Sequence, residues 1–361
     1  MKKAFLLFLL LPLFTSCSFV TLERQIYPIC MSVDLDEENH FRIGVQAPRA
    51  DGGTNASYEI ITATGDTFHD AVQVLSAATP YPLNFSQIRL CLISYSMAAK
   101  TELRPLLRSI LEMPTMRPGC YVSVALGSAL DVMQYQQPDF GMRMSTHLSL
   151  LLDRMRRNHL LPDSTLSYCV RELGDGRCDL LIGVSAVNRS LLPEEEKSTQ
   201  HKEGGQTQGG GEGGGKASPA AVMGEPWSDA IVPSELLAGL LPHTSQNPVE
   251  YLGAAAVSDG RVSGLLTADE VQLALRLMEE AKLRTAREGE QLQLQLLVPA
   301  ESPLADSKDA ICDLMTTLQA LHSDPLTFGC IASMGFWTDA AWEQYDFRSR
   351  YPTAEVVVEE W

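Results

Sequence analysis

Positive charge is scarce in this sequence. The 361 residues include 28 Lys and Arg against 45 Asp and Glu, which gives a formal net charge of -17. Nucleic-acid binding needs basic patches, so the composition argues against a nucleic-acid partner. It also argues against electrostatic attachment to anionic lipid, so a membrane anchor in this chain would have to be hydrophobic.

The chain also lacks an apolar run long enough to cross a membrane. The N-terminal run, Ala4–Phe14, has about eleven residues, whereas a bilayer-spanning helix needs roughly 20. It follows Lys2 and Lys3, and two small residues separate it from Cys17, an order typical of a secretory signal peptide. Because a cysteine directly follows the small residues, the segment resembles a bacterial lipoprotein signal. This resemblance implies that Cys17 is the lipidation site; the alternative is an ordinary cysteine of a secreted protein.

Paired metal-ligand spacing is absent among the cysteines. Besides Cys17 there are seven, and no two of them form a Cys-x-x-Cys pattern. A zinc site needs paired ligands, so no metal site is predicted. Since seven is odd, at least one thiol stays free or pairs between chains. Cys30, Cys91 and Cys120 lie in apolar runs and are predicted to be small core residues.

Common catalytic motifs are missing as well. The sequence contains no Gly-x-Ser-x-Gly, His-Glu-x-x-His or phosphate-loop pattern, and its seven histidines are scattered. Asp34, Asp36 and Glu38 alternate like calcium ligands, but a calcium loop needs glycine where Asn39 stands. A hairpin turn with solvated acids is the favoured interpretation. We therefore expect a protein that is not an enzyme, with no catalytic residue, cofactor or metal.

Strand and helix signals alternate along the chain, which predicts an α/β (mixed α+β), multi-domain fold with mixed sheets flanked by helices. Asp66 is the expected N-cap of the first helix, and Thr267 with Glu270 forms a predicted capping box. Ser164 is expected to cap a short helix that Gly174 ends. Strands are predicted over residues 29–34, 40–47, 58–63, 88–95, 121–125, 180–187, 251–257, 262–266, 292–298 and 354–358. The other predicted helices cover residues 101–113, 128–136, 146–159, 165–173, 267–287 and 306–321.

Changes in composition divide the chain into segments. A glycine-rich stretch over residues 204–215 has almost no apolar content, which predicts a flexible, solvated loop. The predicted segments are a lipoprotein signal peptide (1–16), a lipid anchor and tether (17–24), an N-terminal α/β domain (25–138), a middle domain (139–190), a glycine-rich flexible loop or linker (191–248) and a C-terminal α/β domain (249–361).

Several stretches in order resemble the Ger(x)C family of spore germination lipoproteins, the C subunits of nutrient germinant receptors. After Cys17 come a strand that ends in an acidic turn (30–36) and a second strand (42–46) of the kind this family has. The similarity continues with the motif residues Ala63-Thr-Gly-Asp-Thr67, Ala71, Leu75-Ser76, Pro80, Pro82-Leu-Asn-Phe85 and Arg89-Leu90. It resumes at Tyr251–Val257, Gly264-Leu-Leu266, Asp324–Gly329, Trp342, Tyr351-Pro352 and Ala354–Val358.

The resemblance implies a three-domain architecture and a non-enzymatic role in receptor assembly and signal relay. It also implies a location on the outer surface of the inner spore membrane, beside a multi-span A-type subunit and a transporter-like B-type subunit. The span between Leu266 and Asp324 is short for this family, which predicts a shortened third domain. Two other functions stay open at this point: a small-molecule-binding lipoprotein that feeds a transporter, and a cell-wall hydrolase.

Overall fold

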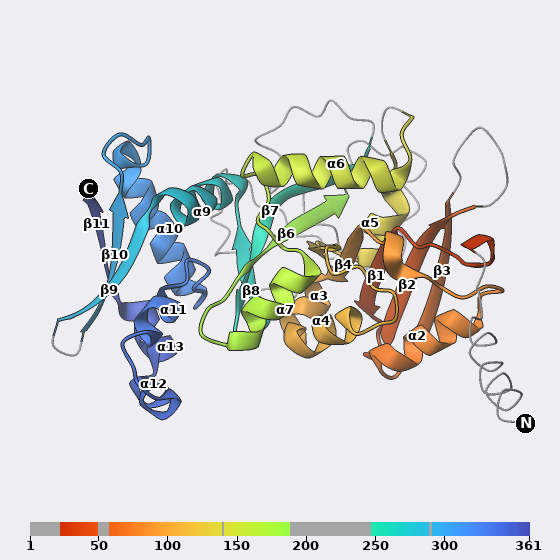
Figure 1. The fold of residues 1–361 in the computed structure, drawn as a ribbon, viewed down its shortest axis with the longest axis horizontal. Helices are drawn as coiled ribbons and strands as arrows, with labels where there is room; N and C mark the ends of the chain where they lie inside the picture. Colours follow the sequence, from red (N-terminus) through yellow and green to blue (C-terminus); the bar gives the residue numbers. More distant parts are fainter. Residues whose placement is uncertain (1–21, 50–57, 139–140, 188–246, 289–290) are drawn as a thin grey trace, which may run out of the picture.

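The structure, a computed structural model, describes residues 22–49, 58–138, 141–187, 247–288 and 291–361. Its largest element is an eight-stranded mixed sheet with the order β3-β2-β1-β4-β5-β6-β7-β8 (Figure 1). Strands β1, β4, β5 and β6 run parallel to one another, while the pairs at both sides of this group are antiparallel. The bounds are β1 Cys30–Leu35, β2 Phe41–Pro48, β3 Tyr58–Gly65, β4 Leu90–Ser94, β5 Tyr121–Ala125, β6 Leu181–Val187, β7 Val249–Ser258 and β8 Arg261–Leu266.

The central strands are buried on both faces. Every residue of β4, β5 and β6 is buried, which explains why their sequences are nearly continuous apolar runs instead of alternating patterns. Cys30, Cys91 and Cys120 lie among them with no exposed surface, which confirms that they are core residues.

Helices fill the connections between the strands. Several begin at a side-chain cap: Ser128 caps α5, and Thr267 with Glu270 forms the predicted capping box of α9. The N-cap of α2 is Thr67, not Asp66, and the left-handed residue that ends α7 is Gly176, not Gly174. The bounds are α2 Phe68–Ala77, α3 Tyr95–Lys100, α4 Leu103–Leu111, α5 Ala129–Tyr135, α6 Met144–Arg157, α7 Leu166–Asp175, α9 Ala268–Glu280, α10 Lys308–Ala320, α11 Phe328–Ser333, α12 Asp339–Tyr345 and α13 Phe347–Arg350.

A second, three-stranded sheet of order β11-β10-β9 stands at the blue end of the molecule, opposite β2 and β3 (Figure 1). Its strands are β9 Lys282–Glu288, β10 Gln291–Val298 and β11 Glu355–Glu360. The prediction of one helix over residues 267–287 was wrong, because α9 ends at Glu280 and β9 follows. Lys, Leu, Arg and Glu favour helices, but pairing with β10 places Leu283 beside Leu296 on the apolar face, and this tertiary contact overrides the local preference.

Two hydrophobic cores meet at the end of the large sheet. In β7, Ala255 and Val257 belong to the core under the large sheet, while Ala254 and Ala256 belong to the core that α9, α10 and the small sheet enclose. Successive side chains of a strand point to opposite faces, so β7 forms a wall shared by both cores. A displacement of β7 would be felt on both sides.

The structure confirms the mixed α and β fold with mixed sheets and flanking helices. Strands from the predicted N-terminal, middle and C-terminal domains share the large sheet, and the domain boundaries themselves stay a prediction. Of the predicted glycine-rich loop (191–248), residues 191–246 lie outside the described residues.

Candidate functional site

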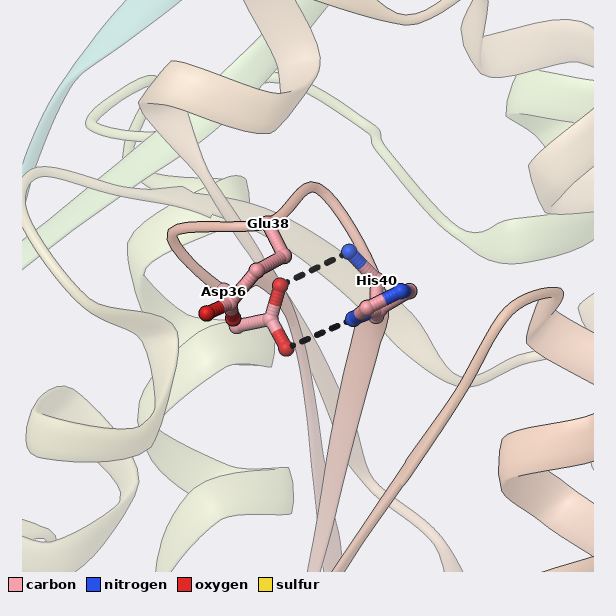
Figure 2. Close-up of side chains that lie close together, drawn as sticks. All are labelled: Asp36, Glu38 and His40. Carbon is pink, nitrogen blue, oxygen red and sulfur yellow. Dashed lines mark hydrogen bonds and ion pairs between the residues drawn. The ribbon is translucent and has the colours of Figure 1, made fainter.

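Asp36, Glu38 and His40 lie together in the turn between β1 and β2, with one ligand atom each within 4.8 Å of the others (Figure 2). The backbone N–H of His40 donates to Asp36 Oδ1 at 2.8 Å, and His40 Nδ1 lies 3.3 Å from Asp36 Oδ2. Desolvation acts to raise the pKa of Asp36, but these hydrogen bonds outweigh it and lower the pKa. Both carboxylate oxygens of Asp36 are thus used inside the turn. The cluster is the hairpin turn that the sequence predicted.

Asp34, the first acid of that alternating set, serves another purpose. Its side chain is buried and accepts hydrogen bonds from Ala129 N at 2.8 Å and Leu130 N at 3.0 Å, at the beginning of α5. Burial raises the pKa of Asp34 to about 6, although these two hydrogen bonds act to lower it. The carboxyl end of β1 is therefore fastened to α5, and Asp34 cannot share a cation with Asp36.

A buried polar cluster at the boundary of the two cores is centred on Asp179, just before β6. Its Oδ1 accepts from Asp259 N at 3.2 Å, and its Oδ2 accepts from Asp324 N at 3.0 Å. The guanidinium of Arg348 in α13 donates to both oxygens, at 3.0 and 3.4 Å. One buried carboxylate thus holds three elements together: the β7–β8 turn, the loop that follows α10, and helix α13. We call Asp179, Asp324, Gly329, Arg348 and the Cys178–Cys330 disulfide the junction.

Asp324 is the second carboxylate of the junction. It accepts from Phe328 N at 3.1 Å and from Gly329 N at 2.6 Å, and so fixes the beginning of α11. Burial raises the pKa of Asp324 to about 8, and the neighbouring Asp179 adds to this, whereas the two hydrogen bonds and Arg348 act to lower it. Gly329 lets α11 approach closely, because a Cβ there would lie 2.1 Å from the carbonyl oxygen of Arg177.

A disulfide between Cys178 and Cys330 closes the junction covalently across 152 residues of sequence. Beside it, Arg177 pairs with Asp339 of α12 at 2.9 Å. The segment before β6 is thereby joined to α11 and to α12. Sequence reasoning singled out the stretch Asp324–Gly329 but missed Asp179 and this disulfide.

We expect the free energy of unfolding to fall as the pH rises from about 4 to 8. A carboxyl pKa near 8 in the folded state, against about 3.9 in the unfolded chain, means that folding favours the protonated form. This contribution is complete below about pH 4 and is lost as the pH passes 8, at no more than about 1.4 kcal/mol per pH unit. Asp34, with a pKa of about 6, adds the same dependence only between about pH 4 and 6.

Urea denaturation at pH 5, 6, 7 and 8 measures this dependence. Asp324→Asn should flatten the decline between pH 6 and 8, whereas the control Asp34→Asn should change it only below pH 6. An unchanged slope between pH 6 and 8 in Asp324→Asn would show that Asp324 does not carry the effect.

The buried cysteine thiols in and beside the large sheet, including Cys169 of α7, are not reactive. Burial raises the pKa of Cys91 to about 12 and also raises the pKa of Cys30, Cys120 and Cys169. A buried, protonated thiol is a poor nucleophile and a poor metal ligand. These residues therefore serve packing.

Cys17, the predicted lipidation site, lies outside the described residues. Among the described residues, no helix is both long enough and apolar enough to span a membrane.

Comparison with known proteins assigns the chain to a family. Residues 19–185 match the family model described as the spore germination protein N-terminal domain. The chain also matches a solved structure titled as the crystal structure of the GerBC protein, with 12% sequence identity over 91% of this chain and 95% of that chain and a TM-score of 0.44. No curated protein matches.

The matched range contains most of the large sheet, from β1 into β6, and includes Asp179 of the junction. Over residues 19–185 the chain belongs to the Ger(x)C family of spore germination proteins, as its motifs predicted.

Proposed function

We propose that this chain is a non-enzymatic, lipid-anchored C subunit of a nutrient germinant receptor that acts in receptor assembly and signal relay. The match to the spore germination N-terminal domain carries the proposal, and it begins at residue 19, two positions after Cys17. The domain thus starts directly behind the cysteine that the leader sequence marks for lipidation.

The anchor defines where the subunit works. Acyl chains on Cys17 would hold the folded part to the bilayer without basic residues, which suits a chain with a net charge of -17. The site of action is the outer surface of the inner spore membrane, and the partners are the A- and B-type receptor subunits. Nucleic acid is not a partner, because the chain lacks basic character.

The junction supports the relay. Signal relay needs surfaces that move together, and β7 is packed against both cores while Asp179, Arg348 and the disulfide connect its turn to α11 and α13. A partner that moved one core would therefore displace the other.

Deletion of the gene tests the proposal. In a strain without a redundant receptor, the spores should lose their response to at least one nutrient, while a receptor-independent trigger still germinates them. A wild-type copy should restore the response. Normal responses to every nutrient in the deletion strain would rule the proposal out.

A further inference from the structure

Two large apolar side chains on the loop between α11 and α12 are exposed to solvent. Met334 is 80% exposed and Trp337 is 100% exposed, the two highest values among the large hydrophobic residues that the structure describes. The loop stands at the blue end of the molecule, and the helix before it, α11, lies beside β9 (Figure 1). Isolated exposed apolar residues are common, but two neighbouring ones of this size are typical of a binding surface.

A hollow of about 420 Å³ lies next to this loop, and we call it the α11–α12 groove. Its wall is mixed: Leu292, Ile331, Ala332 and Tyr345 contribute apolar surface, and Arg284 and Thr285 of β9 contribute polar surface. Its size suits one or two apolar side chains. Gly335 of the loop lines the hollow, so the exposed Trp337 lies two residues further along the same loop. An exposed aromatic side chain and a hollow in one small area are complementary to a partner surface that has a protruding side chain of its own.

Arg284 supplies a second, independent observation. It is exposed and makes no ion pair or side-chain hydrogen bond with the part of the chain that the structure describes. It fits a carboxylate on the occupant, because arginine binds carboxylates with paired hydrogen bonds.

The charges distinguish a protein occupant from a bilayer. Next to the groove, α12 presents Asp339 and Glu343 to solvent, and the chain as a whole is strongly acidic, so an anionic membrane surface would be repelled. Trp, Tyr, Met and Arg are the residue types enriched in the centres of protein interfaces. All four occur in this small area.

We propose that the α11–α12 groove, with Met334, Trp337 and Arg284, docks a segment of a partner receptor subunit that carries an apolar side chain beside a carboxylate. This inference rests on the proposed function, since the A- and B-type subunits are the partners at hand. The occupant buries Trp337, fills the hollow and neutralises Arg284.

Co-purification from detergent-solubilised spore membranes tests the docking. The full-length chain carries an affinity tag, and the co-purified A- and B-type subunits are quantified. The double variant Trp337→Ala/Arg284→Glu should lower their amount at least about tenfold, because hot-spot losses are of this size. Arg284→Lys, which keeps the charge, should lose less. The matched control Leu150→Ala/Arg154→Glu makes the same kinds of change on exposed residues of α6 and should leave the amount unchanged.

A photo-crosslinking residue at position 337 identifies the occupant and does not depend on the folding of the double variant. An adduct with the A- or B-type subunit supports the proposal. An adduct only with lipid, an adduct only with a second copy of this chain, or no adduct would overturn it.

The co-purification experiment distinguishes a failure of the proposed function from a failure of the docking proposal. If the wild-type chain brings down neither subunit, the proposed function fails and the docking inference fails with it. If the wild-type chain and the double variant bring down equal amounts, the proposed function stands and the docking inference is wrong.

Discussion

Gly329→Ala is expected to lower the free energy of unfolding by about 2 to 6 kcal/mol. An alanine Cβ at this position would lie 2.1 Å from the Arg177 carbonyl oxygen and 3.1 Å from Phe347 Cε1, so α11 would have to move away. Overpacking alone costs about 1–3 kcal/mol. The movement would also stretch the 2.6 Å hydrogen bond from Gly329 N to the buried Asp324 carboxyl, and a lost bond of this kind costs about 1–3 kcal/mol more.

Gly174→Ala is the matched control. This glycine is exposed inside α7, nothing lies within 4 Å of a Cβ placed there, and alanine favours helices, so the change should be neutral or stabilise by up to about 1 kcal/mol. Urea denaturation of both variants under non-reducing conditions measures the difference. If Gly329→Ala unfolds within about 0.5 kcal/mol of Gly174→Ala, the close packing of α11 on the segment before β6 is not rigid.

The same substitution bears on the relay. If the junction couples the two cores, Gly329→Ala should impair nutrient germination beyond its effect on protein level. The germination rate should fall by a larger factor than the amount of this chain in the spores. This follows because Gly329 lies next to Cys330 and between the cores, where displacement of α11 alters the connection and not only the stability.

Local rules predicted the large sheet well. The central strands β4, β5 and β6 are buried on both faces and read as continuous apolar runs, and the α9 capping box needs only residues three apart. Lys282–Arg287 was predicted as helix because its residues favour helices; only the partner strand β10 makes it a strand. The short helices α11, α12 and α13 were not predicted, since none is long enough to show a helical period.

The junction could not be predicted from local sequence patterns, because its residues are far apart in the sequence. Asp179 meets Asp324 across 145 residues and Arg348 across 169, and spacing alone says nothing about such pairs. Seven cysteines besides Cys17 allow many pairings, so Cys178–Cys330 could not be chosen from the sequence. The sequence motif Asp324–Gly329 contains two residues of the junction, Asp324 and Gly329. An aspartate inside an otherwise mostly apolar motif was the feature from which a buried carboxyl could have been predicted. Trp337 gave no signal, because apolar residues in a sequence are first assigned to the core.

Cys17→Ala is expected to have the largest effect on the amount of receptor in the membrane. Each buried methylene of an acyl chain contributes about 0.8 kcal/mol to membrane binding, and stable anchoring takes at least two chains. A chain without them, with a net charge of -17, has no electrostatic attraction to replace the anchor. We expect the amount in the spore membrane fraction to fall at least about tenfold, with a matching loss of nutrient germination. Cys312→Ala removes an exposed free cysteine of the folded part and is the matched control.

The most direct measurement is quantitative mass spectrometry of purified inner spore membranes from the wild-type, Cys17→Ala and Cys312→Ala strains. For wild type and Cys312→Ala, we expect an N-terminal peptide that begins at an acylated Cys17, together with normal amounts of the A- and B-type subunits. For Cys17→Ala, we expect depletion of this chain from the membranes and a lowered amount of those subunits. An unmodified Cys17 in the wild type, or normal membrane amounts of the chain and its partner subunits in Cys17→Ala, would contradict a lipid-anchored receptor subunit.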